Sequence, residues 1–159
     1  MNPNIDKIIN DVVSTYVNNK PDLTNMTLKV ARKLIAAVEA KAEEMGVKAV
    51  VAVSDRGGNT IAVECMDDAY IASYDIAVNK AFTCVALKMS TKKLSSLAQP
   101  GESLYGIQFT NNGRIVIFGG GEPLEVEGTV IGAVGVSGGS EEQDTALAAF
   151  AKDVFYKII

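Results

Sequence analysis

Residues 47–66 read VKAVVAVSDRGGNTIAVECM, and this stretch decides the fold. It opens with Val47–Val53, an apolar and largely β-branched run that favours a strand inside a sheet. The turn sequence Asp55-Arg56-Gly57-Gly58-Asn59 follows, and its glycines allow the positive φ angles that a tight hairpin needs. Thr60–Met66 then returns as a second strand, so the stretch predicts an antiparallel hairpin.

A second hairpin is predicted nearer the end of the chain. Pro123–Val126 and Thr129–Val136 have the character of strands, and Glu127-Gly128 between them is typical of a turn. Arg114–Phe118 is predicted as one more strand, which the run Gly119-Gly120-Gly121 ends. The sequence therefore predicts five strands in an antiparallel sheet.

Helices are predicted before, between and after these strands. Thr27–Met45 carries an apolar face and ends at Gly46. Ala69–Lys88 has mostly small apolar residues, which predicts close packing on the sheet, and Thr91–Leu97 is predicted as a shorter helix. Ser140 begins the last helix with a capping box. Glu142-Gln143-Asp144 is interpreted as a favourable charge and cap arrangement, and a role in a pocket is the alternative. The class is α+β, with helices packed on an antiparallel sheet.

The first twenty residues form a unit of their own. An uninterrupted apolar stripe at helical spacing predicts a short amphipathic helix, followed by a polar breaker. The stripe contains Ile5, Ile8, Ile9, Val12, Val13 and Val17. We therefore expect residues 1–20 to be an N-terminal helix and linker, and residues 21–159 to be a single domain.

Composition excludes several classes of function. The chain has 159 residues, a net charge of −4, no His and no Trp. Catalysis by Ser–His or Cys–His pairs and imidazole-based zinc sites are therefore excluded, and the acidic balance argues against a nucleic-acid partner. Cys65 and Cys84 are too few for a disulfide scaffold and are interpreted as reduced thiols in a cytoplasmic protein. No apolar run is long enough to predict a membrane span, and the start of the chain does not have the pattern of a secretory signal.

Four blocks of sequence together carry a resemblance to a known family. The blocks are Met26-Thr27-Leu28 with Ala31 and Gly46-Val47; Ala52-Val53-Ser54-Asp55-Arg56-Gly57-Gly58-Asn59; Met66-Asp67-Asp68-Ala69 with Ser73-Tyr74-Asp75-Ile76-Ala77, Lys80-Ala81 and Thr83; and Gly120-Gly121 with Pro123, Gly132–Gly139 and Glu142-Gln143-Asp144. In this order and spacing the chain resembles the GlcG/HbpS-like family, also called the haem-degrading domain, which includes the C-terminal domain of PduO proteins.

The resemblance implies a three-layer α-β-α sandwich around a five-stranded antiparallel sheet, with helices on both faces, and assembly into homo-oligomers. It also implies haem binding in several relatives, and links to haem breakdown, redox sensing or cobalamin-dependent metabolism. The cofactor expected from it is haem or a corrinoid. Some relatives hold haem iron with a histidine, which this chain does not contain, so that mode of ligation does not carry over.

Candidate ligand-binding residues lie on the third predicted helix and beside it. Asp75, Lys80 and Thr83 form a polar trio on a helix of small residues, which could line a pocket and hold a carboxylate or phosphate. The alternative is that Asp75 and Lys80 are solvated or pair with a neighbouring subunit. Gly120 and Gly121 could offer backbone N–H groups to an anion, although a loop or bulge is the simpler interpretation.

Haem iron would need a soft or phenolate ligand in this chain, because histidine is absent. The candidates are Met66, Met89, Cys65, Cys84, Tyr70 and Tyr74. Of these, Met66 is kept among the ligand-binding residues. No metal site of protein side chains alone is predicted.

Three functional hypotheses stay open. The first is a small-ligand-binding accessory protein, and the second is an enzyme that uses Lys80 or Asp75 as an acid–base group on a small anionic metabolite. The third is a structural protein whose oligomer matters more than any pocket. The N-terminal stripe also resembles the encapsulation peptides of bacterial microcompartment cargo, which implies docking on a shell protein and a place in the microcompartment lumen.

Overall fold

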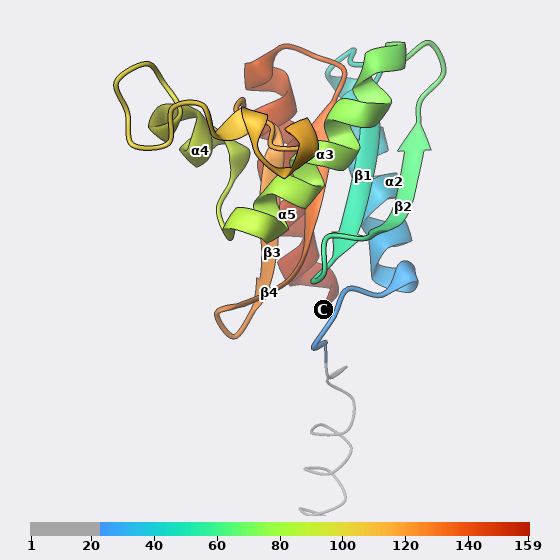
Figure 1. Cartoon of the computed structure of the whole chain (residues 1–159). Helices are drawn as coiled ribbons and strands as arrows, with labels where there is room; N and C mark the ends of the chain where they lie inside the picture. The colour runs from blue at the N-terminus through green and yellow to red at the C-terminus, as the bar shows by residue number, and fades with distance from the viewer. Residues whose placement is uncertain (1–22) are drawn as a thin grey trace, which may run out of the picture.

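The computed structural model describes residues 23–159, and Figure 1 shows the arrangement of its helices and strands. The predicted N-terminal amphipathic helix, with the shell-docking stripe between Ile5 and Val17, lies outside the described residues. The boundary between residues 20 and 21 stays a prediction for the same reason.

The described residues form one antiparallel sheet with the strand order β2-β1-β4-β3. Both predicted hairpins are confirmed: β1 (Val50–Asp55) with β2 (Thr60–Cys65), and β3 (Gly121–Val126) with β4 (Thr129–Ser137). The second hairpin turns at Glu127 and Gly128, whose φ angles of 50° and 76° suit a two-residue turn with positive φ at both positions. The two hairpins join where β1 pairs with β4, from Val50 opposite Ser137 to Asp55 opposite Gly132.

The predicted fifth strand over Arg114–Phe118 is wrong, and the described sheet has four strands. This segment crosses helix α3 instead of pairing with a strand. The Val116 N–H donates to Thr83 Oγ1 over 3.0 Å, and the Arg114 guanidinium lies 3.7 Å from the centre of the Phe82 ring. Side chains of the helix therefore take the place that a neighbouring strand would have.

Helices cover both faces of the sheet, which confirms the three-layer arrangement (Figure 1). Helices α2 (Leu28–Glu44) and α5 (Glu141–Ile158) pack on each other and on one face. Helix α3 (Ile71–Leu87) lies across the other face, and the short α4 (Thr91–Leu97) follows it. Two 3-10 turns, Ile107–Phe109 and Asn111–Gly113, lie in the long connection from α4 to β3. Within residues 23–159 none of the helices has both the length and the apolar character that crossing a membrane requires.

The two faces of the sheet carry side chains of different size. Val51 and Val53 of β1 point into the larger core beneath α2 and α5, whereas Val50 and Ala52 face α3. On the α3 side the chain comes so close that a Cβ at Gly135 would collide with the backbone of α3 at the Ala77 carbonyl oxygen. The small residues of α3 thus let the helix lie directly on β4, as the sequence predicted.

Candidate functional site

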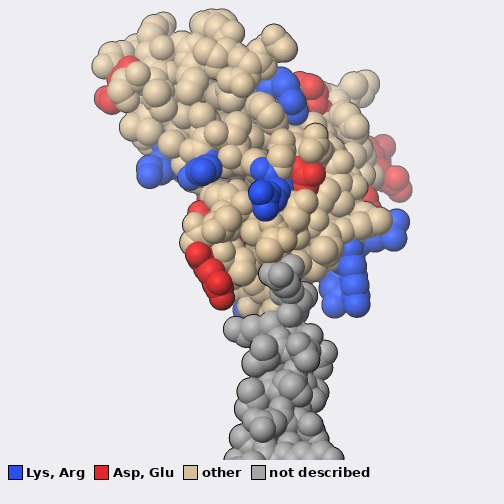
Figure 2. Space-filling model, turned by 60° about the horizontal axis from the view of Figure 1, so that its bottom comes forward, with Lys and Arg blue, Asp and Glu red and all other residues tan. Residues whose placement is uncertain are grey.

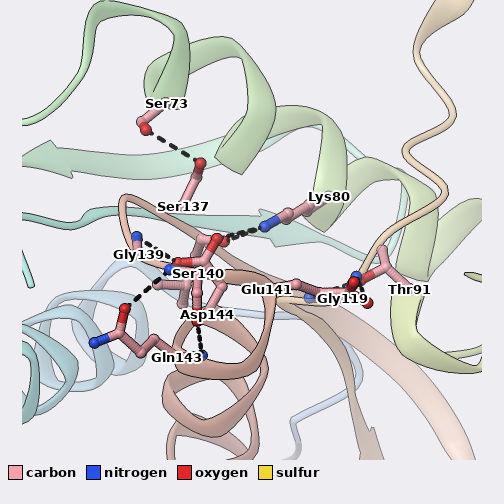
Figure 3. Close-up of polar contacts among 12 residues, drawn as sticks. Ser73, Lys80, Thr91, Gly119, Ser137, Gly139, Ser140, Glu141, Gln143 and Asp144 are labelled. Atoms are coloured by element: carbon pink, nitrogen blue, oxygen red, sulfur yellow. Dashed lines mark hydrogen bonds and ion pairs between the residues drawn. The ribbon is translucent and has the colours of Figure 1, made fainter.

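A pocket opens where the first turns of α3 and α5 meet the end of β4, and its volume is about 270 Å³. The first turns of two helices form walls of the pocket. Helix α3 begins after Tyr70, and α5 begins after its capping residue Ser140. The lining residues are Tyr70, Ala72, Ser73, Ile76, Phe118, Ser137, Gly138, Gly139, Glu141 and Asp144. Figure 3 shows the polar contacts on this side of the sheet.

A buried ion pair lies behind the pocket wall. Lys80 of α3 is 0% exposed, and its Nζ lies 2.8 Å from Asp144 Oδ2 of α5 and 2.8 Å from the Val136 carbonyl oxygen (Figure 3). The same ammonium lies 4.9 Å from the centre of the Phe118 ring. The second Asp144 oxygen, Oδ1, accepts the Gly139 N–H over 2.9 Å, so the carboxylate connects α3, β4 and α5.

Burial disfavours the charged form of both members of the pair, because each loses its hydration. It lowers the pKa of the Lys80 ammonium and raises the pKa of the Asp144 carboxyl. The direct hydrogen bond opposes both shifts, since it favours the charged forms. With the two charged atoms 2.8 Å apart, we treat the pair as ionised in the folded protein.

Two more polar contacts shape the pocket. Ser137 Oγ lies 3.1 Å from Ser73 Oγ, and both residues are buried, so one hydroxyl donates to the other across the β4–α3 interface. Glu141 Oε1 accepts the Gly119 N–H and the Lys92 ammonium, each over 3.0 Å. The hydrogen bond to the Gly119 amide, followed by the contact with Lys92, holds the pKa of Glu141 below its ordinary value.

The structure brings four of the six predicted ligand-binding residues together. Lys80, Thr83, Gly120 and Gly121 are all buried along the α3–β3 interface. A Cβ on Gly120 would lie 2.5 Å from the Lys80 Nζ, and the Gly121 N–H donates to Thr91 Oγ1 over 2.9 Å. These glycines allow close packing around Lys80, and their role in binding a ligand stays a prediction.

The other two predicted residues lie apart from this group. Asp75 is exposed on α3, five residues before Lys80, which places the two on different faces of the helix. Met66 follows β2, where its sulfur accepts the Ala49 N–H over 3.3 Å. None of the six predicted ligand-binding residues lines the pocket.

Among the candidate ligands for haem iron, Tyr70 lines the pocket. Cys84 is fully buried, and burial raises the pKa of its thiol far above the ordinary range. The described residues contain no group of three or more Cys, Asp or Glu side chains placed to hold a metal ion.

Asp144 lines the pocket, although the sequence analysis favoured a helix cap over a pocket role for it. The sequence does contain a signal for it, because Asp144 lies at helical spacing from Leu147, Ala151 and Phe155, which are buried on the same face of α5. A carboxylate in such a stripe indicates a buried, paired charge as well as a helix cap. No comparable signal points to Phe118, which reaches the pocket through the misassigned strand.

Three known proteins show what the chain is similar to. It is 50% identical over 142 residues to the "Uncharacterized 15.0 kDa protein in dhaT-dhaS intergenic region" of Citrobacter freundii, across 89% of this chain and 100% of that protein. It is 37% identical to the corrinoid adenosyltransferase PduO of Citrobacter freundii, across 87% of this chain and 41% of PduO. The crystal structure of a PduOC:haem complex superposes with a TM-score of 0.78 at 37% identity, across 81% of this chain and 94% of that one.

The profile of one protein family, described as "Haem degrading protein HbpS-like", matches residues 26–152. The match includes all four strands and most of the helical residues described above. The chain therefore belongs to the HbpS-like family of haem-degrading proteins.

Proposed function

We propose that this protein is a haem-binding accessory protein, with haem seated at the pocket between α3 and α5. Membership of the HbpS-like family and the likeness to a domain crystallised with haem support the proposal. The observation that carries it in this chain is a pocket with a tyrosine at its edge and an exposed apolar surface beside it.

The size of the pocket decides how a porphyrin would sit. At about 270 Å³ it is slightly smaller than typical ligand pockets, which span roughly 300–1,000 Å³. A porphyrin macrocycle is larger, so only part of it enters. The exposed side chains at the start of α3 would contact the rest, because Tyr70, Ile71 and Tyr74 are 74%, 97% and 51% exposed.

Tyr70 is the residue that we propose as the iron ligand. Phenolate oxygen is an established axial ligand of haem iron, and Tyr70 both lines the pocket and reaches solvent. Haem bound there would supply one-electron redox chemistry. The residues of this chain would bind the ring, orient it through Tyr70, and shield one edge from water with Ile76 and Phe118.

Titration with haemin, followed in the Soret region, tests the proposal. We expect saturable binding by the full-length protein, and at least about tenfold weaker binding with loss of the phenolate-to-iron absorption in Tyr70→Phe. Tyr156→Phe is the matched control, because Tyr156 is also about half exposed but lies near the end of α5.

A wild-type protein that gives no saturable change would overturn haem binding. Unchanged affinity and spectrum in Tyr70→Phe would overturn the role of Tyr70 and leave haem binding intact. Cobalamin, titrated in parallel, separates haem from the corrinoid alternative.

The enzyme hypothesis keeps its two candidate residues but gains no further support from their positions. Lys80 has no exposed surface, and its amine already contacts Asp144 and Val136. Asp75 is exposed on another face of α3. Acid–base chemistry by Lys80 would therefore require the pocket wall to move.

We also propose a homo-oligomeric protein of the cytoplasm whose first twenty residues dock on a microcompartment shell. The family resemblance supports the oligomer, and the N-terminal apolar stripe supports the docking. The structural hypothesis is an oligomer without any ligand. Unlike our proposal, it predicts that the haem titration shows no binding.

A further inference from the structure

The electrostatics of the pocket discriminate between the two edges of a haem molecule. One edge of haem carries two propionates, and the edge opposite carries vinyl and methyl groups. Glu141 and Asp144 line the pocket, whereas none of its lining residues within residues 23–159 is Lys or Arg. Lys80 and Lys92 already pair with these two carboxylates, so a propionate that entered would find no lining cation of its own.

The lysines near the pocket do not change this balance, because each is already paired. Lys80 Nζ bonds to Asp144 Oδ2 and to the Val136 carbonyl oxygen, and its side chain is fully buried. Lys92 Nζ bonds to Glu141 Oε1 on the side of Gly119. To bind a propionate, Lys80 would have to leave Asp144, and a buried carboxylate left alone is strongly unfavourable. The side chain of Lys92 is 55% exposed, and Lys92 does not line the pocket.

The apolar groups of the pocket suit the other edge of the ring. Ile76 and Phe118 offer hydrocarbon and aromatic surface beside Tyr70, and Ala72 adds a small side chain. The two hydroxyls at this site, Ser73 and Ser137, bond to each other and do not need a ligand as partner. Vinyl and methyl groups could thus be buried here without leaving a polar group unpaired.

We propose that the pocket receives the vinyl-bearing edge of haem and that the propionates stay outside it. This inference rests on the haem-binding function proposed above. It makes Ile76 a specificity-determining residue, and it follows from a lining that offers no cation to the acidic edge.

Three porphyrins test the orientation on the full-length protein: haemin, deuterohaemin, which lacks the vinyl groups, and haemin dimethyl ester, whose propionates are uncharged. Binding is followed in the Soret region and by quenching of tyrosine emission, since the chain has no Trp. We expect deuterohaemin to bind about tenfold more weakly than haemin, because apolar burial is lost, and the ester to bind within about twofold of haemin.

Ile76→Ala and Ile71→Ala locate the effect. In Ile76→Ala the difference between haemin and deuterohaemin should fall to about twofold, because the contact with the vinyl groups is gone. Ile71 is 97% exposed on the same helix and does not line the pocket, so Ile71→Ala should keep the full difference. Far-ultraviolet circular dichroism of each variant checks that the fold is retained.

The opposite ranking would overturn the orientation and leave haem binding standing: an ester that binds much more weakly than haemin, together with deuterohaemin that binds equally well. The orientation would also be overturned if Ile76→Ala and Ile71→Ala reduced the affinity difference between haemin and deuterohaemin to the same extent. If none of the three porphyrins binds, the haem-binding function itself falls.

Discussion

Lys80 and Asp144 are buried together, with 0% and 4% of their surfaces exposed. Their separation of 64 residues means that the pair forms only when α3 and α5 have both docked on the sheet. The pair therefore links the elements that form the pocket wall, since Asp144 also accepts the Gly139 N–H. Removing one partner leaves a buried charge with no compensation.

Lys80→Met should accordingly destabilise the protein by about 3–5 kcal/mol in urea unfolding at neutral pH. The double variant Lys80→Met/Asp144→Leu should recover a substantial part of that loss, because it removes the stranded carboxylate and leaves apolar side chains of similar size. Additive losses in the double variant would contradict the coupling inferred from the 2.8 Å contact.

Asp55 makes a second, more exposed set of charge-assisted hydrogen bonds, at the turn between β1 and β2. Its Oδ1 accepts the N–H groups of Gly57 and Asn59 over 2.8 and 2.9 Å. Partial desolvation raises the pKa of this carboxyl, but the hydrogen bonds from Asn59 and Gly57 outweigh that effect and hold the pKa below its ordinary value. A carboxylate with a lowered pKa stabilises the folded state above its unfolded-state pKa, and this contribution disappears as pH falls through the lower, folded-state value.

Asp55→Asn should therefore cost about 1 kcal/mol at pH 7 and less at pH 2–3, because the contribution of the ionised carboxylate diminishes as pH falls towards its lowered pKa. The measurement is the free energy of unfolding in urea at both pH values. Asp75→Asn is the control, because Asp75 is exposed and makes no hydrogen bond recorded within residues 23–159. A loss that is equal at both pH values would contradict the assignment to the ionised carboxylate.

At the scale of elements, the closest contact in the fold is between α3 and β4. Ala77 and Ala81 of α3 lie over Gly135, and the position has no room for a side chain because the neighbouring atoms belong to the helix backbone. Backbone atoms cannot move aside without shifting the whole helix, and α3 carries both Lys80 and one wall of the pocket.

Gly135→Ala should therefore destabilise the protein by about 1–3 kcal/mol or more and weaken haem binding through displacement of α3. Gly57→Ala is the matched control: its new Cβ would meet only the ends of the Asn59 and Asp55 side chains, at 3.0 Å and beyond. Urea unfolding and haemin titration measure the two effects. If Gly135→Ala matches Gly57→Ala in both, the close packing of α3 does not constrain the site.

These elements also show what the sequence could predict. The hairpins follow from local chemistry, because Gly57, Gly58 and Gly128 mark turns and the flanking runs have strand character. Arg114–Phe118 has the same apolar character, yet it contacts Thr83 and Phe82 of α3 instead of a strand. These are tertiary contacts, which a local sequence pattern cannot predict. Helix and hairpin positions are local properties, whereas pairing in a sheet is not.

The candidate site was predictable to a similar degree. Composition and helical spacing bring out Lys80 and Thr83 as unusual polar residues on a helix of small side chains, and both are buried. Their partners come from distant parts of the chain: Asp144 lies 64 residues from Lys80, and Arg114 and Val116 lie more than 30 residues from Thr83. Whether such a lysine faces a pocket or stands behind its wall depends on this long-range packing.

At the scale of the whole molecule, the hydrophobic core of the described residues includes the start of the described chain. Leu23 and Met26 are 7% and 4% exposed, and the Met26 N–H donates to the Ile131 carbonyl oxygen over 2.9 Å. These contacts tie the start of the described chain to β4, and the family match also begins at residue 26. Leu23 and Met26 thus belong to the hydrophobic core of the described residues.

Deletion of residues 1–20 should therefore leave the urea midpoint and the haem affinity close to those of the full-length protein, and should abolish co-purification with microcompartment shells. The stripe that includes Ile9 and Val13 supplies the apolar face that docking in a groove requires. Ile9→Asp/Val13→Asp in the full-length chain should reproduce the loss, and Asn10→Asp, off the stripe, should not. Sedimentation of all forms shows whether oligomer assembly is separate from docking, and a truncated protein that still enters shells would contradict the targeting role of residues 1–20.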